Sequence, residues 1–125
     1  MVGLLLITHN NVGGAVFDAA TSVLGNCPLP FEILPISQSC NPDARLKKAQ
    51  EYIENLQHPD GVLVITDIYG STPSNIATKL KAENVTVVTG LNLPMLLRVM
   101  NYPKLPLNEL AEKALDGGQT GVILV

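Results

Sequence analysis

Short apolar runs alternate along the chain with segments whose apolar positions recur at helical spacing. Runs of branched apolar residues that stop at polar, glycine-containing turns are typical of buried strands in a parallel sheet. The segments between them carry amphipathic or apolar faces and begin at polar or proline residues, as helices do. The predicted strands are Val2–Thr8, Phe31–Ser37, Gly61–Thr66, Val85–Thr89 and Gly121–Val125.

Five helices are predicted between and after these strands. In the second, Asn41 is the expected cap and Pro42 lies in the first turn. In the third, Thr72 is the expected cap and Pro73 the first helical residue. His58 is expected to be solvent-facing within a turn. The helices span Val12–Leu24, Asn41 to about Leu56, Thr72–Lys81, a short apolar segment ending at Met100, and Leu107–Leu115, with Asp116–Gly118 ending the last one.

The alternation of strands and helices implies a parallel sheet with right-handed crossovers. We therefore predict a single α/β domain over residues 1–125, with four parallel strands in flavodoxin-like order 2-1-3-4 flanked by helices. Pro35 places the second strand at an edge of that sheet. The terminal strand Gly121–Val125 is an aggregation hazard unless it is paired. It either closes an edge of its own sheet or adds to a partner subunit, and we favour a homodimer.

Composition narrows the class of protein further. Hydrophobic residues make up 46% of the chain and charged residues 15%, which is typical of a well-packed globular protein. The formal net charge of -3 argues against nucleic acid as a partner. The N-terminal apolar run is far shorter than the roughly twenty residues of a membrane span, and no basic leader precedes it. We expect a cytoplasmic protein.

The two cysteines flank the predicted second strand at opposite ends. An extended segment of that length separates Cys27 from Cys40 by over roughly 20 Å, whereas a disulfide needs Cα atoms within about 7 Å. The sequence contains no Cys-x-x-Cys pair for metal or redox chemistry. We predict two free thiols and no metal site.

Candidate chemistry gathers where the first and third predicted strands end. His9 follows the first strand, and Asp67 follows the third. In the order 2-1-3-4 these strands are neighbours at the point where the order reverses, so both side chains face one crevice. A carboxylate bonded to one imidazole nitrogen fixes the tautomer and leaves the lone pair of the other nitrogen available as a nucleophile.

A predicted anion site adjoins this pair. Gly70, Ser71 and Thr72 precede Pro73 at a helix start, where free backbone N–H groups suit a phosphate. The sequence lacks nucleotide-binding glycine loops and paired carboxylates for magnesium. These features predict phosphoryl transfer through a phosphohistidine, with no cofactor and without ATP as direct donor. Taken singly, His9 is also compatible with a loop histidine, and Asp67 and Thr72 with turn and helix caps.

Three sequence blocks stand out, namely Thr8-His9, Asp67–Asn75 and Gly90–Leu96. Together they resemble the mannose-class IIA domain of the bacterial phosphoenolpyruvate-dependent sugar phosphotransferase system. The resemblance implies that Nε2 of His9 accepts a phosphoryl group from the phosphocarrier protein HPr. The group then passes to a IIB partner or serves as a regulatory signal. The resemblance also implies that Asp67 orients the ring, while Thr72 and nearby amides hold the phosphate.

The resemblance further implies a four-stranded parallel sheet whose C-terminal strand is exchanged in a homodimer, and it allows peripheral association with a membrane permease. Two positions depart from the family pattern, because Asn10 and Ser71 stand where glycine is usual. Glycine tolerates backbone angles that other residues do not, so the amide cradle is expected to differ in shape.

Two other functions are compatible with the same residues. One is the phosphotransfer subunit of a dihydroxyacetone kinase, which resembles this family in fold and in its histidine near the N-terminus. The other is a non-enzymatic regulatory module that binds a small anion, with His9 hydrogen-bonding the ligand and never becoming covalently modified.

Overall fold

A parallel β-sheet forms the centre of the molecule, in the predicted strand order. The computed structural model describes residues 1–56 and 59–125, so the prediction for His58 lies outside the described residues. Within them, four parallel strands lie in the order β2-β1-β3-β4, which confirms the predicted fold class. The strands are β1 (Gly3–His9), β2 (Phe31–Ile36), β3 (Val62–Thr66) and β4 (Val85–Thr89).

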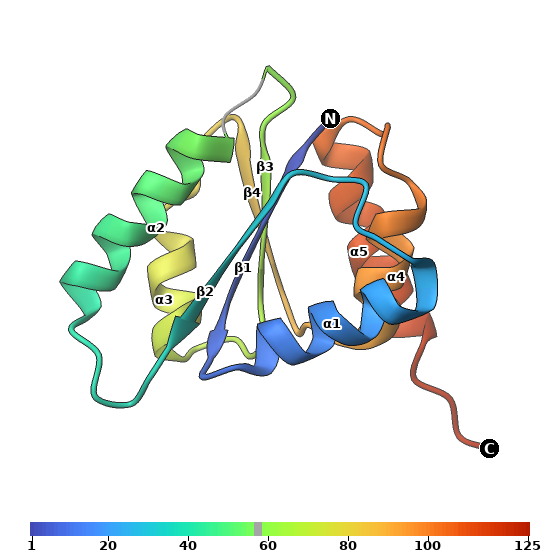
Figure 1. The fold of residues 1–125 in the computed structure, drawn as a ribbon, viewed down its shortest axis with the longest axis horizontal. Helices are drawn as coiled ribbons and strands as arrows, with labels where there is room; N and C mark the ends of the chain where they lie inside the picture. Colours follow the sequence, from blue (N-terminus) through green and yellow to red (C-terminus); the bar gives the residue numbers. More distant parts are fainter. Residues whose placement is uncertain (57–58) are drawn as a thin grey trace.

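Helices cover both faces of this sheet (Figure 1). A helix connects each strand to the next one along the chain, which is the arrangement that strand–helix alternation predicts. Apolar side chains from the two sheet faces pack beneath the helices and form two separate cores. One face carries α1 (Val12–Leu24), α4 (Leu93–Asn101) and α5 (Leu107–Thr120), and the other carries α2 (Pro42–Leu56) and α3 (Thr72–Thr78).

The two-residue period of β1 distributes its side chains between these cores. Leu6 belongs to the core beneath α1, α4 and α5, whereas Ile7 belongs to the core beneath α2 and α3. By the same alternation, Thr8 faces α1 and His9 lies on the α2–α3 side of the sheet. The buried hydroxyl of Thr8 accepts a 2.7 Å hydrogen bond from the backbone N–H of Gly13, which ties the first turn of α1 to the end of β1.

Two helix starts differ in how well the sequence predicts them. The cap of α2 is confirmed, because Oδ1 of Asn41 accepts hydrogen bonds from the first-turn amides of Asp43 and Ala44. In α3, Thr72 is the first helical residue and Ser71 holds the cap position, so the predicted cap is wrong by one residue. The helix also ends at Thr78 and not at Lys81, because the amides of residues 79–81 bond to carbonyls three residues back and tighten the chain into turns.

The predicted end of the last helix is wrong. Asp116–Gly118 does not stop α5, which continues to Thr120. A Cβ atom at Gly117 would lie 2.5 Å from Cβ of Arg98, and one at Gly118 would lie 2.8 Å from Cε of Met95. These glycines allow α5 to approach α4 closely, so their absent side chains serve helix packing.

The predicted terminal strand does not form within this chain. Residues Val122 to Val125 are each at least 74% exposed and leave the domain beyond α5 (Figure 1). Gly121–Val125 therefore does not close an edge of its own sheet. Exchange of this segment with a second subunit stays a prediction.

Gly117→Ala is expected to destabilise the protein by about 2 kcal/mol, because the added methyl group overlaps the Cβ of Arg98. Helix propensity favours alanine by up to about 1 kcal/mol, so the tertiary overlap has to dominate. Equilibrium urea unfolding measures the change. The control is Gln119→Ala on the exposed face of α5, expected within about 0.5 kcal/mol of wild type. Equal stability of the Gly117 and Gln119 variants would contradict the packing role.

Candidate functional site

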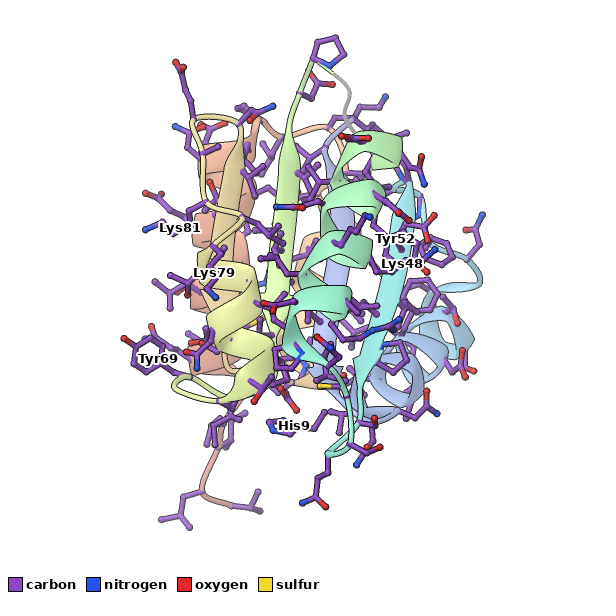
Figure 2. The ribbon with its side chains drawn as sticks, turned by 90° about the vertical axis from the view of Figure 1, so that its left-hand side faces the viewer. His9, Lys48, Tyr52, Tyr69, Lys79 and Lys81 are labelled. Atoms are coloured by element: carbon purple, nitrogen blue, oxygen red, sulfur yellow. The ribbon has the colours of Figure 1, made fainter. Side chains whose placement is uncertain are left out.

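The structure brings the side chains of His9 and Asp67 into contact at the carboxyl end of the sheet. His9 is the last residue of β1, and Asp67 directly follows β3. The ring atom Nδ1 of His9 lies 2.9 Å from Oδ2 of Asp67. The same carboxylate oxygen accepts a 3.0 Å hydrogen bond from the backbone N–H of His9. Figure 2 shows His9 at the end of the molecule where the strands finish.

The carboxylate of Asp67 is oriented on both of its oxygens. Its Oδ1 accepts a 3.1 Å hydrogen bond from the backbone N–H of Ile68. The Asp67 side chain is only 13% exposed, whereas the imidazole of His9 is 42% exposed. A carboxylate can only accept, so it favours the tautomer with hydrogen on Nδ1. Nε2 has no hydrogen-bond partner among the described residues, and in this tautomer it carries the lone pair of the ring.

The turn after His9 adopts a backbone conformation that suits asparagine. Asn10 has φ of 44°, in the left-handed region, where asparagine is among the more tolerated residues other than glycine. Its backbone N–H donates to the carbonyl of Ile36 at 2.9 Å, which ties the turn to the neighbouring strand. The departure from glycine at this position therefore fits the observed backbone.

Ser71 also fits without the freedom of glycine. Its φ of -107° and ψ of 174° are ordinary extended angles. The neighbouring Gly70 has φ of 82°, so glycine is required one residue earlier. Both departures from the family pattern are thus compatible with the loop geometry in this chain.

A pocket of about 260 Å³ lies beside the histidine. His9 and Asn10 line it from the end of β1, and Thr72 lines it from the start of α3. The β2–α2 loop contributes Gln38 and Cys40, which sequence reasoning did not select. The predicted strand order could have indicated these residues, because it places the end of β2 beside the end of β1.

The three predicted phosphate-binding residues differ in whether their donor groups already have hydrogen-bond partners. Thr72 lines the pocket, and its hydroxyl has no hydrogen-bond partner within the described part of the chain. The amide of Gly70 donates to Oγ of Ser74 at 3.3 Å, a contact that the sequence analysis missed. The hydroxyl of Ser71 donates to the carbonyl of Ile68 at 2.8 Å. Thr72 is therefore the member of this set that shares the pocket with His9.

Other chemistry is sparse in the described residues. Within the ranges 1–56 and 59–125, no three His, Cys, Asp or Glu side chains gather to hold a metal ion. Cys27 and Cys40 are free thiols, and burial raises the pKa of the Cys27 thiol. In the same ranges, no helix combines the length and apolar character that crossing a membrane requires.

The fold and the site together define a doubly wound α/β protein with a histidine–aspartate pair at the point where strand order reverses. The family model described as the fructose IIA component of the phosphotransferase system (PTS) matches residues 3–115. The chain belongs to this PTS IIA family, and the mannose-class resemblance of its three sequence blocks is confirmed.

Solved structures of similar proteins share the fold. The mannose/sorbose-specific IIA subunit from Enterococcus faecalis superposes with a TM-score of 0.89 at 22% identity, covering 99% of this chain and 94% of that one. The IIA component from Streptococcus agalactiae gives 0.87 at 18% identity, covering 99% and 97%. The IIA protein associated with the fucose utilization operon of Streptococcus pneumoniae gives 0.83 at 22% identity, covering 99% and 96%.

Asp67→Ala is expected to shift the His9 ring away from the tautomer that carries hydrogen on Nδ1, because the acceptor at 2.9 Å is lost. Nitrogen-15 NMR of the imidazole distinguishes the two ring nitrogens directly. Asp43→Ala, which removes an exposed carboxylate from the first turn of α2, is the matched control. An unchanged His9 spectrum in the Asp67 variant would contradict the orienting role.

Proposed function

We propose that this protein is a phosphoryl carrier of a sugar PTS that uses Nε2 of His9 as the acceptor atom. The observation that carries the proposal is the 2.9 Å contact between Nδ1 of His9 and Asp67, on an imidazole that is 42% exposed and lines a pocket. Family membership supports it, since PTS IIA domains work with HPr and IIB components. HPr is the proposed donor, and a IIB component or a regulatory target is the proposed acceptor.

The proposed step is an in-line displacement at phosphorus. The lone pair on Nε2 of His9 forms a bond to the phosphorus of the donor's phosphohistidine. The phosphorus–nitrogen bond of the donor breaks, and its electron pair returns to the donor's ring nitrogen. The His9 ring, with hydrogen retained on Nδ1, then carries a positive charge that the carboxylate of Asp67 stabilises. Attack by the acceptor's nucleophile reverses these changes and restores the neutral ring.

The phosphoryl oxygens would be held by neutral donors. Thr72 offers its hydroxyl from the pocket wall, and the amide of Gly70 has only a long 3.3 Å bond to Ser74 to exchange. The described loops at this end, residues 10–11, 37–41, 67–71 and 90–92, contain no lysine or arginine. Dipoles alone stabilise a dianion moderately, which suits a carrier that passes the group on.

Incubation with phosphoenolpyruvate, enzyme I and HPr is expected to add one acid-labile phosphoryl group, and His9→Ala should abolish the labelling. Intact-mass spectrometry before and after acid treatment measures it. His58→Ala, at the other histidine of the sequence, is the matched control and should still be labelled. Asp67→Ala should slow the transfer about 10-fold or more, because the ring loses its orienting carboxylate.

One outcome would contradict this function, and another would contradict the exclusion of ATP as direct donor. Unlabelled wild-type protein in the presence of active carriers would favour the non-enzymatic anion-binding module. Labelling by ATP alone would overturn the inference drawn from the missing nucleotide-binding loops.

We further propose that Gly121–Val125 adds to the sheet of a second copy in a homodimer. β4 is an edge strand of the sheet, and an edge strand has backbone groups available for pairing. A groove of about 340 Å³ beside it is lined by apolar atoms of Val87, Val88 and Leu115. The exposed terminal segment supplies apolar side chains of the kind that such a groove accepts.

Deletion of residues 121–125 is expected to convert a dimer to a monomer that keeps its helical and strand content. Sedimentation velocity measures the association state, and far-ultraviolet circular dichroism checks the fold. Val23→Ala, which truncates an exposed apolar residue near the end of α1, is the control and should stay dimeric. A monomeric full-length chain at about 100 μM would contradict the exchange.

A further inference from the structure

Two large apolar side chains project from the β3–α3 loop beside the histidine–aspartate pair. Ile68 is 57% exposed and Tyr69 is 80% exposed, and they are the next two residues after Asp67. Figure 2 shows Tyr69 pointing away from the body of the molecule, at the same end as His9. Neither side chain is needed for the core or for the contact between Nδ1 of His9 and Asp67.

The loop that carries them is held by its own hydrogen bonds. The backbone of Ile68 is bonded on both sides, since its N–H donates to Asp67 and its carbonyl accepts from the hydroxyl of Ser71. The amide of Gly70 donates to Ser74 in the first turn of α3. Because the backbone is already ordered, a partner that buries these side chains orders little further chain.

The rim around His9 carries almost no charge. Among the described loop residues 10–11, 37–41, 67–71 and 90–92, Asp67 is the single charged side chain, and it is bonded to His9. The helix starts around the site add Asp43 and Arg45 on α2. A protein that covers this rim therefore meets apolar and neutral polar groups, with no ion pair available from the loops.

We infer that Ile68 and Tyr69 form an apolar docking surface for the protein that delivers the phosphoryl group to His9. The inference rests on the phosphoryl-carrier function proposed above. A donor protein has to bring its phosphorus within bonding distance of Nε2, so it has to cover the rim from which these side chains project. Tyrosine and isoleucine then bury apolar area against an uncharged, apolar patch on the donor, and the aromatic ring loses little conformational entropy in doing so.

The test separates docking from chemistry by using two donors. Phospho-HPr has to dock, whereas phosphoramidate phosphorylates histidine as a small molecule. Tyr69→Ala and Ile68→Ala are expected to raise KM for phospho-HPr at least about fivefold. The rate of Tyr69→Ala with phosphoramidate should stay close to wild type. Tyr69→Phe keeps the ring and should restore the wild-type KM. Tyr102→Ala, at the end of α4 away from the site, is the matched control and should leave KM unchanged.

The dependence of KM on salt concentration provides a second test of the apolar docking surface. With an apolar anchor and a neutral rim, KM for phospho-HPr should change less than about threefold between about 50 and about 300 mM salt. A steeper dependence would overturn the apolar docking surface.

The remaining outcomes are equally decisive. An unchanged KM in Tyr69→Ala refutes the docking surface. A parallel loss with phosphoramidate also refutes it, because the side chain would then act on the site itself. Dissociation of a dimer by Tyr69→Ala would show that a second copy covers this patch and refutes the assignment to the donor. Failure of both donors to label the wild-type protein refutes the phosphoryl-carrier function itself.

Discussion

A single carboxylate oxygen holds the site together. Oδ2 of Asp67 accepts from the backbone N–H of His9 and contacts Nδ1 of its ring, so one atom joins the ends of β1 and β3 and sets the direction of the imidazole. The second oxygen accepts from the amide of Ile68, which keeps the carboxylate from rotating. This arrangement favours the tautomer with hydrogen on Nδ1 and leaves Nε2 without a hydrogen-bond partner among the described residues.

The sheet positions His9 for this contact. Because successive side chains of a strand alternate between faces, Thr8 can anchor α1 while its neighbour His9 remains on the α2–α3 side. The turn after His9 is tied to β2 through the amide of Asn10. Thr8, His9 and Asn10 thus bind α1, the end of β3 and β2, respectively. These elements are packed in the two cores, so they hold the histidine in place.

The sequence predicts the strands and their order from local pattern, and it misses features that depend on how particular segments pack against one another. Branched apolar runs identify the four strands, and their order at the crossover places His9 beside Asp67. Gly117 reads locally as a helix stop, yet the nearness of Arg98 on α4 explains why glycine is needed there inside a helix. Residues such as Cys40 enter the pocket through the turn after β2, a loop whose path no periodicity describes. The apolar terminal segment has strand-like composition, but a strand needs a partner, and this chain alone does not provide one.

The backbone of this chain accommodates Asn10 and Ser71, which stand where the family pattern usually has glycine. Asn10 occupies a left-handed conformation that asparagine tolerates, and Ser71 has an extended backbone that any residue adopts. The glycine that the geometry demands is Gly70, whose φ of 82° lies in the left-handed region. The backbone angles at these positions, and not the family's usual residue types, therefore decide which side chains the turns beside His9 accept.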